Sequence, residues 1–219
     1  MKEENESKKV ELDTWKGDFG DDYTKRRHCD NDLVNRIGKT LFRLLTNIGV
    51  GPSSSLLEVG SNLGYNLIGL ALSGWKGKLY AVEPNPKAYR ELLEHSKGLI
   101  EKVYSADGSL LPFNDHSIDL VFTSGVLIHI HPERLEKVCS EIFRVSRKYV
   151  LCMEYFSSIP DEQVYRGESG LLFRRDFGRY YLELFPSLEL VDYGFLWSKV
   201  VPFDDLNWWL FKKVKRKVI

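Results

Sequence analysis

The stretch Leu56-Leu57-Glu58-Val59-Gly60-Ser61-Asn62-Leu63-Gly64 decides the fold that the rest of the chain has to fit. An apolar run ends in an acidic residue, two glycines follow, and an amphipathic segment begins at once. This order is typical of a buried parallel strand that leads through a tight turn into a helix. Glycine suits such a turn because it adopts positive φ and lets a ligand approach the backbone closely. Open α/β sheets bind nucleotides at loops of this kind.

Segments with strand and helix patterns alternate along the chain. Strands are expected at about 56–59, 78–83, 99–105, 118–123 and 149–154, and helices at about 30–47, 65–72, 84–95 and 132–145. This alternation predicts an α/β fold with a doubly wound, mainly parallel sheet. After a further helix at 173–185, two strands at 188–199 and 207–214 fit a C-terminal antiparallel hairpin. The predicted sheet therefore has seven strands.

The composition indicates one main domain with a small N-terminal addition. The chain has 219 residues, of which 43% are hydrophobic, enough for a sizeable core. Residues 1–14 are expected to form a mobile, charged tail, 15–50 an N-terminal lid and helix, and 51–219 the main domain. The 31 basic and 31 acidic residues cancel, which argues against a protein that binds nucleic acid or membrane surfaces. The oligomeric state stays open.

The three cysteines, Cys29, Cys139 and Cys152, lack CxxC spacing and are expected to be reduced thiols. The first nine residues are charged and have no apolar core, unlike a signal peptide. No apolar run approaches the length that a membrane span needs. We therefore expect a soluble, cytoplasmic protein.

Three acidic residues stand at the ends of the first three predicted strands, namely Glu58, Glu83 and Asp107. The carboxyl ends of parallel strands meet at one edge of the sheet, so these acids should face one crevice. Glu83 lies about as far past the glycine turn as the acid that holds a ribose diol in dinucleotide folds, about 20 residues on. Asp107, with Gly108, would accept the exocyclic amine of an adenine. These acids in register with one glycine loop predict a nucleotide-like ligand.

These motifs, with the strand 118–125, resemble the class I methyltransferases that use S-adenosylmethionine and have a Rossmann-like fold. The resemblance covers about residues 56–154. It implies that the glycine loop runs under the amino-acid part of the cofactor, that Glu83 holds the ribose and that Asp107 contacts the adenine. The usual middle glycine is Asn62 here, and asparagine tolerates left-handed backbone angles. The expected cofactor-binding residues are Tyr23, Arg27, Glu58, Gly60, Asn62, Gly64, Glu83, Asp107, Gly108 and Ser124.

A narrower resemblance, to methylases associated with pseudaminic acid biosynthesis, spans nearly the whole chain. It rests on the blocks 15–21, 125–130, 154–156, 165–167, 173–177 and 191–195. It implies that the methyl acceptor is a nonulosonic acid, its precursor or its nucleotide-linked form. The acceptor atom is not specified by this resemblance.

Methyl transfer from a sulfonium is an in-line displacement, which depends on alignment in a dry pocket. A hydroxyl acceptor also needs a general base. His129, after the fourth strand, is a candidate base, and the alternative is a partly buried imidazole bonded to backbone. His129 and His131 also resemble a metal pair, but no third ligand has suitable spacing, so no metal is expected. His131 fits the start of a helix better.

Further candidates follow the fifth strand. Glu154 and Tyr155 are grouped with His129 as catalytic residues, with Glu154 orienting the acceptor or capping a turn. The expected substrate-binding residues are His129, Tyr165, Arg166 and Arg174. Arginine grips carboxylates and phosphates through paired donors, although exposed arginines are often only solubilising.

The sequence also predicts that Tyr23 and Arg27 fold over the cofactor as part of a lid. Two other functions compete with methyl transfer to a small, anionic sugar. One is a scaffold that binds the cofactor without catalysis, and the other is a nicotinamide-dependent oxidoreductase. The second is disfavoured because the turn lacks a Gly-x-Gly-x-x-Gly array.

Overall fold

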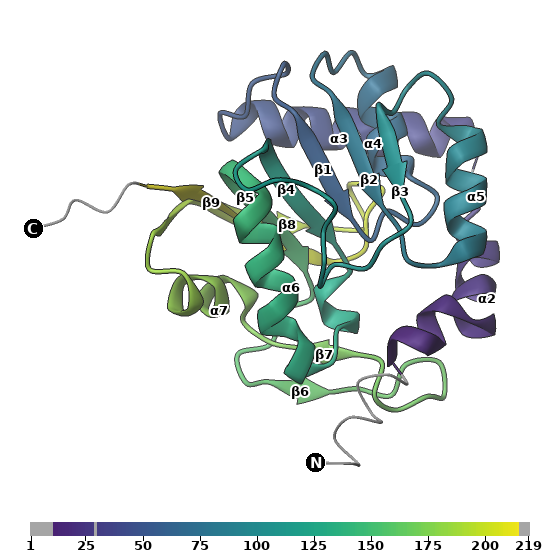
Figure 1. Ribbon diagram of the computed structural model, residues 1–219, viewed down its shortest axis with the longest axis vertical. Coiled ribbons are helices and arrows are strands. Elements are labelled where there is room, and N and C mark those ends of the chain that lie inside the picture. Colours follow the sequence, from purple (N-terminus) through teal and green to yellow (C-terminus); the bar gives the residue numbers. More distant parts are fainter. Residues whose placement is uncertain (1–10, 29, 215–219) are drawn as a thin grey trace, which may run out of the picture.

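The computed structural model describes residues 11–28 and 30–214, and its centre is a seven-stranded sheet with the order β3-β2-β1-β4-β5-β9-β8 (Figure 1). Its strands are β1 (Leu56–Val59), β2 (Leu79–Val82), β3 (Lys102–Tyr104), β4 (Ile118–Ser124), β5 (Ser146–Glu154), β8 (Leu188–Leu196) and β9 (Leu206–Lys213). The helices are α2 (Asp18–Arg26), α3 (Asn31–Asn47), α4 (Tyr65–Leu72), α5 (Pro86–His95), α6 (Pro132–Val145) and α7 (Phe177–Leu184). A 3-10 turn, η1 (Leu127–His129), follows β4, and a second small sheet pairs β6 (Asp161–Glu162) with β7 (Phe173–Arg174).

Strands β1 to β5 run parallel, β9 pairs antiparallel with β5, and β8 pairs antiparallel with β9 at the edge of the sheet. The predicted fold class is therefore confirmed, including the C-terminal hairpin. Every residue of β1 and all but the last residue of β4 are buried. Parallel strands show this pattern because helices cover both of their faces. The carboxyl ends of the five parallel strands consequently lie along one edge.

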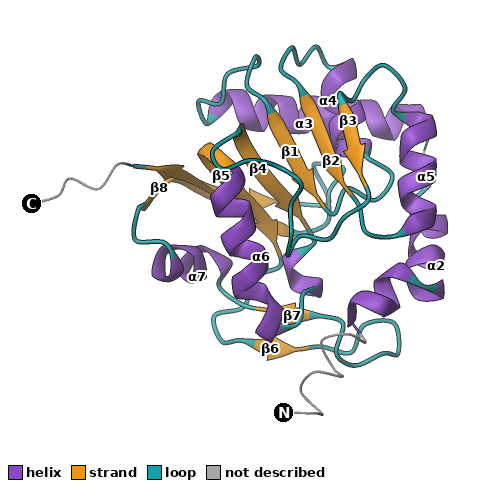
Figure 2. Cartoon of the chain, viewed as in Figure 1, coloured by secondary structure: helices purple, strands orange, loops and turns teal. Residues whose placement is uncertain are grey.

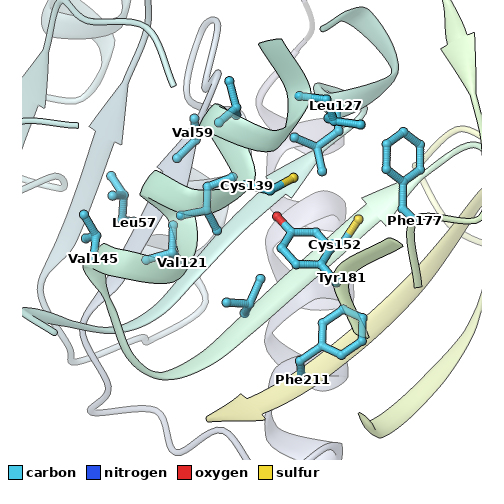
Figure 3. Close-up of a cluster of buried hydrophobic side chains, with 14 of the residues drawn as sticks. Leu57, Val59, Val121, Leu127, Cys139, Val145, Cys152, Phe177, Tyr181 and Phe211 are labelled. Atoms are coloured by element: carbon cyan, nitrogen blue, oxygen red, sulfur yellow. The ribbon is translucent and has the colours of Figure 1, made fainter. Parts of the chain in front are cut away.

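Helices cover both faces of the sheet (Figure 2), and one hydrophobic core lies on each face. Alternate residues of β1 divide between them, with Leu56 in one and Leu57 in the other. Helices α3, α4 and α5 pack around the first core, and α6 and α7 around the second. Figure 3 shows part of the second core, where Tyr181 of α7 lies beside Cys139 and Cys152. Both of these cysteines are free, as predicted, and the structure places them in the interior.

Helices α3 and α4 meet backbone to backbone at two glycines. A Cβ atom on Gly38 would lie 2.0 Å from the backbone of Gly69, and one on Gly69 would lie 2.5 Å from the carbonyl oxygen of Val34. No side chain fits at either position, so both helices depend on glycine at this contact. We predicted α3 as part of the N-terminal region. In the structure it packs directly on α4 and belongs to the helical layer on one face of the sheet.

The helix predicted at 173–185 begins later than expected. Phe173 and Arg174 form β7 and pair with β6, and the helix starts at Phe177. Asp176 caps it by accepting a hydrogen bond from the backbone N–H of Arg179. An aspartate in this position is a strong N-cap, so the start of the helix is set by the cap rather than by the apolar residues before it.

Two strands are shorter than predicted. The third strand spans only Lys102–Tyr104, and β8 ends at Leu196 rather than near residue 199. The register of β8 against β9 shifts between Leu190 and Asp192, which marks a bulge on this edge strand.

The N-terminal region is helical where the structure describes it. Residues 11–16 are helical and lead into α2, so the predicted tail over 1–14 is wrong for residues 11–14. The reason is packing, because Glu11 is buried against the main domain. Residues 1–10 and Cys29 lie outside the described residues. In the part of the chain that the structure describes, no helix has the length and apolar character of a membrane span.

Candidate active site

The loop between β1 and α4 has left-handed backbone angles at three positions. Gly60 has φ of 76°, Asn62 of 45° and Gly64 of 73°. A Cβ atom on Gly60 would lie 2.7 Å from the Val126 side chain, and one on Gly64 would lie 2.2 Å from Leu92. The expectation that asparagine substitutes for the middle glycine in a left-handed conformation is therefore confirmed.

This loop borders a cavity of about 480 Å³ at the carboxyl ends of the parallel strands. A cavity of this size holds a nucleotide-sized ligand. Most of the residues expected at the site line it, namely Tyr23, Arg27, Glu58, Gly60, Asn62, Glu83, Asp107, Gly108, Ser124, His129, Tyr155 and Tyr165. Four expected residues do not line this cavity, namely Gly64, Glu154, Arg166 and Arg174.

Glu58 is the third of the four buried residues of β1, and it lines the cavity. Its Oε1 accepts a hydrogen bond from Asn66 Nδ2 at 2.6 Å, whereas Oε2 has no partner among the described residues. Burial, with the nearby charge of Glu83, raises the pKa of Glu58 to about 8 in spite of the bond from Asn66. A buried acceptor without a partner is costly, so this oxygen is suited to a ligand that donates.

Glu83 lies at the end of β2 and is held by two backbone N–H groups. Its Oε2 accepts from Asn62 at 2.7 Å, and its Oε1 accepts from Asn85 at 2.8 Å. Burial raises the pKa of Glu83 to about 7, although both bonds favour the charged form. Each carboxylate oxygen has a second lone pair, so both can still accept from a ligand hydroxyl.

Asp107, after β3, is part of an ionic bridge that the sequence did not reveal. Arg134 Nη2 lies 3.2 Å from Asp107 Oδ1, and Arg134 Nη1 lies 3.1 Å from Glu11 Oε2. Burial alone would raise the pKa of Asp107, but hydrogen bonds from Ser109 and the charge of Arg134 lower it overall. Burial raises the pKa of Glu11 despite the same arginine. The helical segment 11–16 is thus fastened at the edge of the cavity.

Asn85 forms a second attachment between the N-terminal region and the main domain. Its Nδ2 donates to the carbonyl oxygen of Trp15 at 3.0 Å and to Asp21 Oδ1 at 2.9 Å. Trp15 lines the cavity, as do Tyr23 and Arg27 of the same region. The guanidinium of Arg27 lies 5.8 Å from the centre of the Tyr23 ring. The N-terminal segment therefore covers the cavity, where the sequence predicted a lid.

His129 ends η1 and lies in a cluster of aromatic rings. Its ring centroid is 4.6 Å from that of Trp15 and 4.9 Å from that of Tyr165. His129 Nδ1 lies 2.6 Å from the carbonyl oxygen of Leu171, which can only accept, so Nδ1 carries the proton. Burial lowers the pKa of His129 to about 4, against the opposite effect of the Leu171 bond. The imidazole is consequently neutral at pH 7, with the lone pair on Nε2.

Glu154 is fully buried below η1 and does not reach the cavity. Its Oε1 accepts from the backbone N–H of Val126 at 3.2 Å, and its Oε2 accepts from that of Ile128 at 3.4 Å. Burial raises the pKa of Glu154 to about 7 despite these bonds. Glu154 therefore supports the turn that carries His129, which agrees with the second of the two predicted roles, the capping of a turn.

Tyr155, the next residue, does line the cavity, together with Asp204 from the loop before β9. Burial, followed by the charge of Asp204, raises the pKa of Tyr155 to about 12. The hydroxyl is therefore protonated at neutral pH and can donate to a ligand or to Asp204.

The two arginines expected to bind the substrate lie outside the cavity. Arg174 pairs with Asp161 in the small sheet and borders an open depression next to the cavity. Arg166 has φ of 54° in an exposed turn, with its guanidinium 5.7 Å from the Tyr165 ring centre. The depression meets the cavity at Tyr155 and Asp204, which border both.

His131 is the N-cap of α6, as its place before Pro132 suggested. Within residues 11–28 and 30–214, no group of three or more His, Cys, Asp or Glu side chains is arranged to hold a metal ion.

Residues 57–153 match the protein family described as "Methyltransferase domain". This range contains the glycine loop, all three strand-end acids and His129. The chain contains a methyltransferase domain. The prediction made from the glycine loop and the acids is confirmed at this level, whereas the narrower resemblance to pseudaminic acid methylases is not.

Solved structures with the same fold as this methyltransferase domain include two methyltransferases. Magnesium protoporphyrin IX methyltransferase from Synechocystis PCC 6803, with bound SAM, has a TM-score of 0.67 and 16% identity, covering 95% of this chain and 97% of that one. The 1,6-didemethyltoxoflavin-N1-methyltransferase of Burkholderia thailandensis, with S-adenosylhomocysteine, has a TM-score of 0.67 and 14% identity, covering 97% and 90%. At these sequence identities the similarity is evidence of a shared fold alone.

A curated relative from Haemophilus influenzae, described as an uncharacterized protein, is 31% identical over 127 residues. The match covers 52% of this chain and 51% of the relative, so the chain spans about half the length of that protein.

Sequence reasoning missed several residues of the methyltransferase domain and its lid that line the cavity. Trp15, Arg134 and Asp204 are the main ones. Trp15 lies in the aromatic N-terminal patch that was predicted as a lid, so its position was within reach of the sequence. Arg134 lies on the polar side of a helix, and Asp204 lies in a turn, where charged residues are usually solvated.

Proposed function

We propose that this chain transfers methyl groups from S-adenosylmethionine. The observation that carries the proposal is the cavity, where a left-handed loop and three strand-end acids meet in a methyltransferase domain. The residues present suit the cofactor, because Glu58 Oε2 and Asn62 Oδ1 are buried acceptors without a partner in the described part of the chain. An ammonium group would satisfy both. When bound, the cofactor supplies a methyl group activated by its sulfonium.

The residues that would hold the methyl donor lie at the ends of the parallel strands. Glu83 accepts from the ribose hydroxyls, and its two backbone bonds fix its carboxylate for that task. Asp107 meets the adenine amine from beside Arg134, while Tyr23 and Arg27 cover the amino-acid part. The remaining contacts come from the backbone of Gly60, Gly108 and Ser124 and from Glu58 and Asn62.

His129 takes the proton from the acceptor. The Nδ1–H bond to Leu171 leaves the lone pair on Nε2, and the low pKa keeps it unprotonated at pH 7. A weak base is sufficient, because the acceptor oxygen becomes strongly acidic as it gains the methyl group. Glu154 holds the turn, and Tyr155 can donate a hydrogen bond to the acceptor.

The proposed acceptor is a small sugar that carries an anionic group, such as a nonulosonic acid, its precursor or its nucleotide-linked form. The proposal is supported by the resemblance of the sequence blocks and by Arg26, a cation that lines the cavity. Arg174, with Asp161, lies in the adjoining depression, where it can bind the far part of a longer acceptor. Tyr165 packs on His129 and closes the acceptor side.

Two measurements test this function. Calorimetry with S-adenosylmethionine and with a nicotinamide nucleotide should give binding of the first alone, and the reverse result would favour the oxidoreductase. Incubation of the protein and S-adenosylmethionine with sugar acids and their nucleotide-linked forms should then give products heavier by one methylene by mass spectrometry. Binding of the cofactor without any such product across sugars and other hydroxyl or amine acceptors would favour a non-catalytic scaffold.

A further inference from the structure

Asn62 has a side chain at a position where the backbone does not require one. Its φ of 45° is a conformation that glycine adopts freely, as Gly60 and Gly64 do on either side. The carboxamide nevertheless makes a specific contact. Its Nδ2 donates to Thr24 Oγ1 of α2 at 3.0 Å, across 38 residues of sequence. The side chain of Asn62 therefore connects the loop under the cavity to the segment that covers it.

The hydrogen bonds of Thr24 fix the orientation of this carboxamide. The buried hydroxyl of Thr24 donates its one proton to the carbonyl oxygen of Gly20 at 2.9 Å, so it can only accept from Asn62. The Nδ2 group consequently faces Thr24, and Oδ1 faces the other way. This Oδ1 is buried and has no partner among residues 11–28 and 30–214.

The unpaired oxygen is suited to a ligand that donates hydrogen bonds. Asn62 lines the cavity beside Glu58, whose Oε2 is a second buried acceptor without a described partner. The backbone N–H of Asn62 also donates to Glu83 Oε2 at 2.7 Å. Two unpaired acceptors close to the carboxylate of Glu83 make a site for a protonated amine, since an ammonium group has three donors and no acceptor.

We propose that the carboxamide of Asn62 joins the amino group of the methyl donor to helix α2, so that binding of the donor's amino-acid part closes the N-terminal segment. This inference rests on the proposed function. Oδ1 accepts from the ammonium group while Nδ2 stays on Thr24, so one planar group is held from both sides. A glycine at this position would bind the donor through its backbone but would leave the covering segment unconnected to it.

The first test compares two ligands that differ in the amino-acid part. S-adenosylhomocysteine has it, and 5′-methylthioadenosine lacks it. In calorimetry, Asn62→Gly should weaken binding of S-adenosylhomocysteine by about tenfold or more, as for a lost hydrogen bond to a charged group. Its affinity for 5′-methylthioadenosine should stay that of the wild type. Equal losses for both ligands, or no loss for either, would overturn the role of Asn62.

The second test follows α2 by hydrogen exchange with mass spectrometry. S-adenosylhomocysteine should slow exchange over residues 18–26 in the wild type and in Thr24→Ser, which keeps the hydroxyl. The slowing should be several-fold smaller in Thr24→Val and in Asn62→Gly. Equal protection in all four proteins would refute the connection. If the wild type binds neither ligand, the proposed function itself fails, which separates that failure from a failure of Asn62 alone.

Discussion

The Nδ1–H of His129 donates to the carbonyl oxygen of Leu171 across 2.6 Å and so joins the turn after β4 to the segment before β7. Because a carbonyl can only accept, this contact sets the tautomer of the imidazole without a carboxylate partner. It leaves Nε2 unprotonated in a ring that packs against Trp15 and Tyr165.

Replacement of His129 by alanine should reduce kcat by about 100-fold to 10,000-fold, the usual contribution of a general base. Binding of S-adenosylmethionine, measured by calorimetry, should stay within about twofold, because the imidazole lies on the acceptor side. His129→Gln, which keeps a polar group of similar size, is the matched control and should be equally slow. Turnover of either variant at the wild-type rate would remove His129 from the mechanism.

The pH dependence of turnover should report the same group. Burial lowers the pKa of His129 to about 4, so the active neutral form persists down to that pH. With S-adenosylmethionine and acceptor saturating, we expect kcat to fall as the pH drops through about 4, over the range where circular dichroism shows a folded protein. A fall centred near 6.5 would mean that the imidazole is not desolvated as the structure indicates.

Replacement of Glu83 by glutamine should weaken binding of S-adenosylmethionine about 100-fold. The variant loses the charge that strengthens bonds from hydroxyl groups, each worth about 1.5 to 3 kcal/mol when charged. Glu101→Gln is a suitable control, because Glu101 is an exposed acid that pairs with Lys78 outside the cavity. Equal dissociation constants for Glu83→Gln and the wild type would refute the role of Glu83.

Glu154 should make the protein less stable as the pH rises. Its pKa is about 7 in the folded protein against 4.5 for an ordinary glutamate, so between these values the folded state binds a proton that the unfolded chain has released. Its contribution to stability is therefore fully present below pH 4.5 and is lost as the pH rises through about 7.

Glu154→Gln is neutral at every pH and should lack this loss. Its free energy of unfolding relative to the wild type, from urea titrations, should rise between pH 4.5 and 7 by an amount on the order of 3 kcal/mol. A difference that stays constant over this range would show that Glu154 is not buried as an acid.

Arg134→Met should lower the free energy of unfolding by about 3 kcal/mol, because it leaves Glu11 and Asp107 without their shared cation. For a chain of this size we expect the melting temperature to fall by several degrees. Glu11→Gln added to this variant should recover part of the loss. Arg179→Met, which breaks an exposed pair with Glu183, should change stability by less than about 1 kcal/mol. Similar losses for both arginines would contradict the burial of the bridge.

The sequence predicted the parts of the structure that local patterns determine. The predicted helices 65–72 and 132–145 match α4 and α6. The apolar spacing indicates each helix, and Gly64 and Pro132 mark where the two helices begin. The strand-end acids share one cavity because the carboxyl ends of parallel strands lie at the same edge of the sheet.

Features that depend on distant contacts were not predictable in this way. Glu11 meets Arg134 across 123 residues, and nothing in the charged N-terminus distinguishes this acid from its solvated neighbours. Arg174 was expected to bind the substrate, and in the structure it pairs with Asp161 across the small sheet of β6 and β7. Each of these strands has two residues, which is too short to give a recognisable strand pattern in the sequence. Glu154 was placed correctly at the end of β5, yet its burial depends on η1 folding over it.

The irregular register of β8 bears on how the protein behaves at high concentration. This strand is one edge of the sheet and exposes Tyr193 and Phe195, which on a straight strand would invite edge-on addition of other chains. The bulge between Leu190 and Asp192 interrupts the regular row of backbone donors and acceptors, and a carboxylate follows it. Aggregation through this edge is thereby disfavoured, so a variant that restores regular pairing, by deleting Val191, should precipitate sooner than the wild type on concentration.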